Sequence, residues 1–178
     1  MEKDAETVLV VGATGNIGIA TIIGALRSDR NVLAVVRNQH SAKNVFEHVL
    51  GGHDRIKIVE ANAVSDEGVQ SVVDKVRAGG LCPLSSMYLL VVRELVMQHT
   101  NQQDIDHRIV GGQYFSQDIF NTTTEELQRS IKVNFKSNFY TYQATIPYLP
   151  EQKHRRCTWT TCTGLQGDIG DFALLAIS

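Results

Sequence analysis

The stretch VLVVGATGNIG, residues 8–18, decides the fold that we predict for this chain. It begins with an uncharged aliphatic run, residues 8–11, which is typical of a parallel strand buried on both faces. A glycine-rich turn follows, and apolar residues then recur at helical spacing over residues 16–27. The residues expected on the buried side of this helix are Ile17, Ala20, Ile23 and Leu26. The start of the chain therefore predicts a strand, a tight turn and a helix.

The following residues repeat this alternation of strand and helix. Residues 31–36 and 56–59 are rich in β-branched side chains and predict two more strands. Residues 41–50 predict a helix that ends at two glycines, and another helix begins near Ser65, where a serine can cap free backbone amides. The buried side of that second helix is marked by Val69, Val72, Val73 and Val76. Because alternating strands and helices imply a parallel sheet with right-handed crossovers, we expect a three-layer, doubly wound α/β fold of the Rossmann type.

The second half of the chain is less regular. Residues 87–92 predict a fourth strand, whereas residues 93–108 are polar, show no period and predict an irregular insertion or loop. Residues 158–162 predict a fifth strand. Since no repeats or linkers are evident, residues 1–178 are expected to form a single domain.

A long helix is predicted ahead of the fifth strand. Thr123-x-x-Glu126 has the form of a capping box, in which each side chain satisfies a backbone amide at the start of a helix. We expect this helix to run to about Tyr148. Its apolar side carries Leu127, Ile131, Phe135 and Phe139.

Composition and charge argue against several classes of partner. The formal net charge of −2 provides no overall positive field to attract nucleic acid or an anionic membrane. The basic run KHRR, residues 153–156, is short and is explained equally well as a solvated turn. The three cysteines show no C-x-x-C spacing and the histidines are scattered, so no metal site is expected. Residues 8–26 are uncharged but interrupted by glycines, which favours strand, turn and helix over a membrane span. The start MEKDAET lacks the pattern of a signal peptide, so we expect a cytoplasmic protein.

The glycine turn predicts a binding site for a pyrophosphate. A strand that turns tightly into a helix directs backbone N–H groups and the positive end of the helix dipole at one point. Glycine is required where a Cβ would obstruct the turn or the approach of a phosphate to the main chain. The candidate binding residues are Gly12, Thr14, Gly15, Asn16, Ile17 and Gly18. An ordinary tight turn without a ligand is the alternative.

The spacing Gly12-x-x-Gly15-x-x-Gly18 resembles the glycine motif of the short-chain dehydrogenase/reductase (SDR) superfamily, most closely that of its extended and atypical branches. The segments VEANAVSDE, IKVNFKSNFYTYQATIPYL and WTTCTGLQG follow in the order that this superfamily shows. The resemblance implies a nicotinamide dinucleotide as cofactor and a small-molecule substrate whose carbonyl or alcohol exchanges a hydride with it. It also implies a homodimer.

The choice of cofactor is set in such folds at the end of the second strand, where an acidic side chain binds the ribose hydroxyls of NAD. This chain has Arg37 there and no acid. An arginine can pair with the 2′-phosphate of NADP through its planar fork of donors, so NADP is favoured over NAD, with a solvent-facing arginine as the alternative. Asn62 stands where the family usually has an aspartate that contacts the adenine, which is a departure from the family pattern.

For catalysis the resemblance implies a Tyr-x-x-x-Lys pair assisted by a serine and an asparagine. Asn134 matches the asparagine, which in the family supports a proton path through the helix backbone, and Thr161 takes the serine position. A solvent-facing polar residue and a strand residue without a role are the alternatives. At the family spacing from Thr161, the positions of the tyrosine and lysine hold Leu174 and Ser178, and none of the five tyrosines is followed by lysine four residues later.

Three functional hypotheses follow for this chain. The first is an NADP(H)-dependent oxidoreductase in which another group, with Tyr114 as the candidate, replaces the missing acid. The second is a dinucleotide-binding sensor or partner subunit without catalysis. The third is a truncated or misspliced product of a longer gene, because the aperiodic residues 93–108 stand inside what should be a compact passage of strand, loop and helix.

Overall fold

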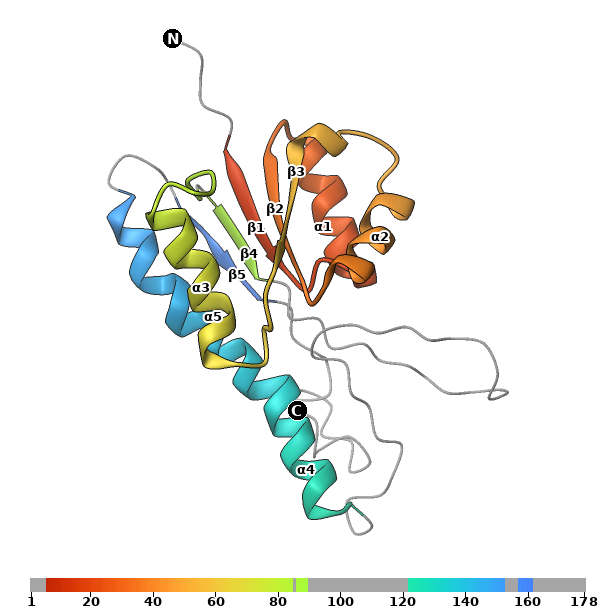
Figure 1. The fold of residues 1–178 in the computed structure, drawn as a ribbon, viewed down its shortest axis with the longest axis vertical. Helices are drawn as coiled ribbons and strands as arrows, with labels where there is room; N and C mark the ends of the chain where they lie inside the picture. The colour runs from red at the N-terminus through yellow and green to blue at the C-terminus, as the bar shows by residue number, and fades with distance from the viewer. Residues whose placement is uncertain (1–5, 85, 90–121, 153–156, 162–178) are drawn as a thin grey trace.

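A parallel β-sheet forms the centre of the molecule. The computed structural model describes residues 6–84, 86–89, 122–152 and 157–161. The strands are β1 (Thr7–Val11), β2 (Asn31–Val36), β3 (Ile56–Glu60), β4 (Ser86–Leu89) and β5 (Trp159–Thr160). All neighbouring strands pair in parallel, in the order β3-β2-β1-β4-β5, as Figure 1 shows. The predicted α/β class and the parallel sheet are therefore confirmed; residues 93–108 lie outside the described residues.

Helices cover both faces of this sheet. On one face lie α1 (Asn16–Arg27) and α2 (Gln39–His48), and on the other lie α3 (Asp66–Arg77) and α5 (Ser137–Thr145), as Figure 1 shows. A short helix, η1 (His53–Arg55), precedes β3. Because side chains alternate along a strand, one set of β1 and β2 residues packs against α1 and α2 and the other set against α3 and α5. Both faces of the sheet are thus buried, as the three-layer prediction requires.

The buried side of α1 differs from the predicted one. Of the four apolar residues expected there only Leu26 is buried, and Ile17 is 37% exposed. The residues that face the sheet are Gly18, Ile19, Ile22, Ala25 and Leu26. Gly18 explains this orientation, because a Cβ there would lie 2.2 Å from the carbonyl oxygen of Gly12. Gly18 therefore faces the loop, and the residues on the same side of the helix are buried in the core.

The long helix begins at the predicted capping box. The Thr123 hydroxyl accepts a hydrogen bond from the Glu126 amide (3.2 Å), and the Glu126 carboxylate accepts one from the Thr123 amide (2.8 Å). The helix consists of α4 (Thr124–Ser130), a π-helical stretch η3 (Ile131–Lys136), α5 and a terminal 3₁₀ turn η4 (Ile146–Glu151). The long helix extends about as far as predicted, to Tyr148 and beyond. The π-helical stretch, however, shifts the side of the helix on which the later residues lie.

The apolar side expected of this helix is exposed. Phe135 is 64% exposed, and Leu127, Ile131 and Phe139 are exposed as well. Apart from Tyr148 in η4, the buried residues of the long helix are Ser130, Ser137, Thr141, Ala144 and Thr145. These side chains are small, and the hydroxyls of Thr141 and Thr145 bond to carbonyls four residues earlier, so the helix packs closely on α3 without unpaired hydroxyl groups.

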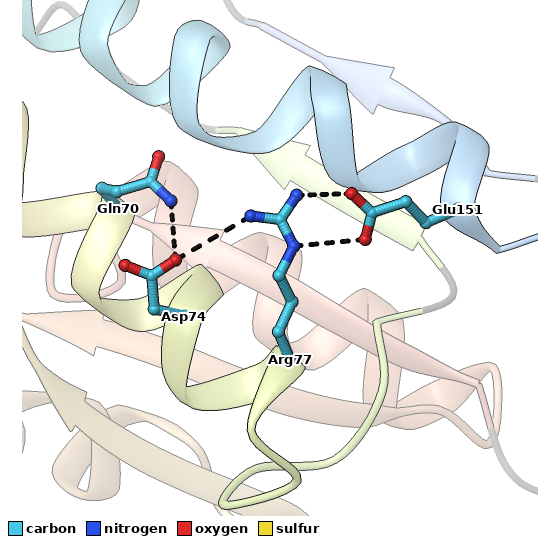
Figure 2. A network of polar contacts seen from close by, with 4 residues as sticks. All are labelled: Gln70, Asp74, Arg77 and Glu151. Atoms are coloured by element: carbon cyan, nitrogen blue, oxygen red, sulfur yellow. Dashed lines mark hydrogen bonds and ion pairs between the residues drawn. The ribbon is translucent and has the colours of Figure 1, made fainter.

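A polar network joins the end of α3 to η4, as Figure 2 shows. The Arg77 guanidinium donates two hydrogen bonds to the Glu151 carboxylate, at 3.1 and 2.5 Å. It also lies 3.8 Å from Asp74, which accepts a hydrogen bond from Gln70 at 2.8 Å. The same guanidinium stacks over the ring of Tyr148, 5.8 Å from its centroid. This network clamps the long helix to α3.

The clamp predicts a specific loss of stability in acid. The hydrogen bonds from Arg77 hold the pKa of Glu151 below its ordinary value of 4.5. A carboxylate whose pKa is lowered by folding stabilises the folded state above its unfolded pKa, and that contribution is lost as pH falls through the folded pKa. We expect Glu151→Gln to lower the Tm at pH 7 and this deficit to shrink as the pH falls below 4.5. Thermal unfolding on both sides of this pH tests this, and parallel curves for the two proteins would contradict it.

Candidate functional site

The predicted binding residues follow the strands at one edge of the sheet. Gly12 comes directly after β1, Arg37 directly after β2, Asn62 two residues after β3 and Thr161 directly after β5. Because the strands are parallel, their carboxyl ends lie at the same edge. Ligands of doubly wound sheets bind at this edge. The fold therefore brings these four residues to one side of the molecule.

The glycine loop adopts a conformation that only glycine takes readily. Gly12 has a φ of +80°, in the left-handed region. The amide of Gly15 donates to the carbonyl of Gly12 at 3.2 Å and closes the turn. The amide of Ile19 then donates to the Gly15 carbonyl at 2.8 Å, which is the first hydrogen bond of α1. The loop thus reverses direction within a few residues and delivers the chain into the helix.

The N-terminus of α1 is open to an anionic ligand. Its N-cap is Gly15, no side chain caps it, and its first turn contains no acidic residue. By contrast, the side chain of Asn38 caps α2 and that of Thr123 caps α4. The first amides of a helix have no partner inside the helix, so those of exposed Asn16 and Ile17 are available to a ligand. Free amides at the positive end of a helix dipole suit the charge of a pyrophosphate.

Arg37 lies beside the same edge. Its side chain is exposed and makes no hydrogen bond or ion pair with the described residues. The following residue, Asn38, starts α2 and accepts hydrogen bonds from the amide (2.9 Å) and hydroxyl (2.8 Å) of Ser41. The position of Arg37 is therefore fixed at its backbone by β2 and the cap of α2, while its guanidinium is free to pair with a phosphate.

Asn62 shapes the loop after β3. Its side-chain oxygen accepts a hydrogen bond from the Val64 amide at 3.2 Å, and its backbone carbonyl accepts one from the Ser65 hydroxyl at 3.1 Å. Ser65 is the N-cap of α3, but its side chain does not cap that helix, so the predicted cap is wrong: the hydroxyl is used by the Asn62 carbonyl instead. The side-chain N–H₂ group of Asn62, which is exposed, is the part that can face a ligand.

Asn134 lies inside the π-helical stretch, where widened turns often occur at functional sites. Its side-chain nitrogen donates to the Ser130 hydroxyl at 3.0 Å, and its side-chain oxygen is buried with no donor among the described residues. Asn138 donates from its own side chain to the backbone carbonyl of Asn134 at 2.6 Å. The backbone carbonyl of Asn134 therefore accepts a hydrogen bond from another side chain of the same helix.

The residues expected to complete catalysis are described only in part. Thr161 is exposed directly after β5, whereas Tyr114, Leu174 and Ser178 lie outside the described residues. Among the described residues, no group of three or more histidines, cysteines or acids is placed to hold a metal ion. In the same part of the chain no helix has the length and apolar character needed to cross a membrane.

Two residues of this region were missed by the sequence analysis. Asn138 follows Asn134 by four residues, so their helical spacing was a signal that could have found it. Asn44 in α2 donates a hydrogen bond to the backbone carbonyl of Thr14, which is thirty residues away. No local pattern indicates the second contact, because it depends on how α2 packs beside the glycine loop.

Comparison with known proteins gives one relative from the family that the glycine motif resembles. No family model matches the chain. The short-chain dehydrogenase/reductase iacG of Pestalotiopsis fici is 40% identical over 165 residues, which cover 93% of this chain and 58% of that relative. This chain therefore spans a little over half the length of the curated relative that it matches.

Solved structures of short-chain oxidoreductases share the fold. The NADPH-bound short-chain oxidoreductase of Pseudomonas aeruginosa PAO1, which contains an atypical catalytic centre, matches with a TM-score of 0.73 at 14% identity, over 97% of this chain and 59% of that chain. The 3-ketoacyl-(acyl-carrier-protein) reductase of Brucella melitensis, in complex with NADH, matches with a TM-score of 0.73 at 16% identity, over 97% and 62% of the two chains. The chain is therefore similar in sequence to a short-chain dehydrogenase/reductase over 58% of that relative's length, and it shares the fold of solved short-chain oxidoreductases, in agreement with its glycine motif Gly12-x-x-Gly15-x-x-Gly18.

Proposed function

We propose that this protein binds NADP(H) and acts as an oxidoreductase on the carbonyl or alcohol of a small metabolite. The observation that carries the proposal is the open N-terminus of α1, where a glycine N-cap, free amides and the absence of acidic residues form a cradle for a pyrophosphate. Gly12 and Gly15 leave room for the phosphates to approach the backbone. Arg37 at the same edge supplies the charge that suits a 2′-phosphate.

The remaining candidate residues have supporting parts in this proposal. The bound dinucleotide would supply the hydride that the reaction transfers. Asn62 would contact the adenine through its side-chain N–H₂ group, and the Thr161 hydroxyl, at the end of β5, would hold the substrate oxygen. Asn134 would contribute through its buried side-chain oxygen, which has no donor in the described part of the chain.

A sensor or partner subunit that binds the cofactor without catalysis is the second candidate. It is favoured by the hydrogen bond from Asn138 to the Asn134 carbonyl, because this bond engages part of the helix backbone to which the family resemblance assigns the proton path. Titration of the purified protein with NADPH and NADH, followed by cofactor fluorescence, tests both candidates. Binding with turnover of ketones or alcohols supports the oxidoreductase, binding without turnover of a broad panel supports the sensor, and no binding overturns both.

The preference for NADP(H) predicts the effect of reversing the charge of Arg37. We expect Arg37→Glu to raise the Kd for NADPH by about 10- to 100-fold, since a charge-assisted hydrogen bond is lost and a repulsion is added. The Kd for NADH should not rise and should fall if the new carboxylate binds the ribose hydroxyls, because NADH lacks the 2′-phosphate. Arg129→Glu, an equal charge change at an exposed residue of α4, is the control. Unchanged NADPH affinity in Arg37→Glu would remove the assigned preference.

A further inference from the structure

A side chain of α2 reaches the glycine loop. The side-chain nitrogen of Asn44 donates a hydrogen bond to the backbone carbonyl of Thr14 at 2.7 Å, in a partly buried position. This contact joins two elements that are separated by the whole of α1 and β2. It also lies within the segment that the proposed function uses for phosphate binding, so its effect on the shape of that segment matters.

The contact completes the fixation of one peptide group. The Thr14 carbonyl and the Gly15 amide belong to the same planar peptide. That amide donates to the Gly12 carbonyl at 3.2 Å. The Thr14 carbonyl, which points the opposite way in the same peptide, accepts the hydrogen bond from Asn44. The next carbonyl, that of Gly15, accepts the Ile19 amide at 2.8 Å. Two successive peptide groups are thereby fixed, and the directions of the following free amides depend on them.

The helix that carries Asn44 is itself held in place. Asn38 caps its N-terminus, and Ala42 and Val45, on either side of Asn44, are buried in the core between α1, α2 and the sheet. A donor on such a helix has little freedom to follow the loop if the loop moves. The Thr14 carbonyl is therefore tied to a rigid support rather than to a mobile side chain on the surface.

We propose that Asn44 is a positioning residue for the nucleotide pyrophosphate. By holding the Thr14–Gly15 peptide, it keeps the amides of Asn16 and Ile17 directed at the phosphates. This inference rests on the proposed function, because it concerns the same cofactor site. It differs from the role of Arg37, since the pyrophosphate is common to NADPH and NADH, and a defect in the loop must weaken both cofactors alike.

The test compares Asn44→Leu, which keeps the branching at Cγ but has no donor, with the wild-type protein. We expect the Kd values for NADPH and NADH both to rise by about 3- to 10-fold, as loss of one hydrogen bond predicts, with their ratio unchanged. Asn44→Gln keeps an amide donor and should recover part of the affinity. Ser28→Ala is the matched control, because it removes a hydrogen bond from a side chain to a backbone carbonyl (2.9 Å) at the opposite end of α1. It should leave both Kd values unchanged.

A measurement without cofactor makes the test independent of binding. Hydrogen exchange of the Gly15 amide should be faster in Asn44→Leu than in the wild type, since the peptide has lost one of its two restraints. Should Asn44→Leu fail to fold, Asn44→Ser, which is too short to reach the carbonyl, replaces it in both measurements.

The outcomes separate this inference from the proposed function. If the wild type binds neither cofactor, the proposed function fails, and the inference fails with it. If the wild type binds and the Asn44 variants bind equally well, only the inference is overturned. A lower Tm with unchanged Kd values would make the contact purely structural. Selective loss of NADPH affinity would mean that Asn44 acts through Arg37, and this result too would overturn the assigned role.

Discussion

Gly18→Ala is expected to destabilise the protein by about 1–3 kcal/mol, the usual cost of forcing extra atoms into a packed site. The added Cβ would lie 2.2 Å from the Gly12 carbonyl oxygen and 2.9 Å from the Ala13 Cα, and both of these atoms belong to the backbone. Relief requires α1 to move away from the loop, which also displaces the amides that the cofactor is proposed to bind. We therefore expect NADPH affinity to fall together with stability.

Gly24→Ala provides the control in the same helix. Its added Cβ meets no atom within 4 Å, and the residue is exposed. Alanine favours a helix interior over glycine, so this substitution should stabilise the protein by about 0.5–1 kcal/mol and leave NADPH affinity unchanged. Urea unfolding and NADPH titration of the two variants check both expectations. A Gly18→Ala protein as stable as Gly24→Ala would show that α1 does not pack against the loop as described.

Ile22→Ala is expected to cost about 2–5 kcal/mol, a large share of the stability of a typical domain. Ile22 is fully buried and packs in the core between the sheet, α1 and α2. Truncation removes apolar contacts and leaves a cavity that the surrounding strands cannot fill without strain. The Tm should fall by about 2–4 °C for each kcal/mol in a protein of this size.

Phe135→Ala removes a larger side chain but should cost far less. Phe135 is 64% exposed in the π-helical stretch, so most of its surface is already in contact with water. Substitutions at such surface positions usually change stability by about 0.5 kcal/mol or less. Urea unfolding at several protein concentrations compares the two variants. Equal losses would contradict the description, because they would mean that the ring of Phe135 is covered in solution.

Much of the secondary structure was predictable from local pattern. The predicted bounds of β2 and α1 coincide with those observed, and all four valines expected on the buried side of α3 are buried. These elements are marked by a β-branched run in β2, by apolar residues at helical spacing in α1 and α3 and by the glycines soon after α3, and such signals depend on near neighbours in the chain. The capping box at Thr123 is local in the same way, and both of its hydrogen bonds are present.

The orientation of two helices was not predictable in this way. In α1 the contact of Gly18 with the loop decides which side is buried, and in the long helix small side chains rather than Phe135 and Phe139 face α3. Hydrophobic periodicity identifies a helix but does not identify its buried side when another requirement is stronger. Here the stronger requirement is close approach of the backbones, which only small residues permit.

Some features of the candidate site were likewise predictable from local sequence, and others were not. The sequence by itself determined the parallel α/β architecture, the glycine turn after β1 and the residues at the strand ends, because each depends on residues that are close in the chain. Only the tertiary structure decided that Asn44 holds the Thr14 carbonyl, because these residues are thirty positions apart. This hydrogen bond depends on the packing of α2 beside the loop, whereas the contact of Asn138 with the Asn134 carbonyl lies within one helix. The direction of the Asn44 side chain is set by that packing and not by residue type.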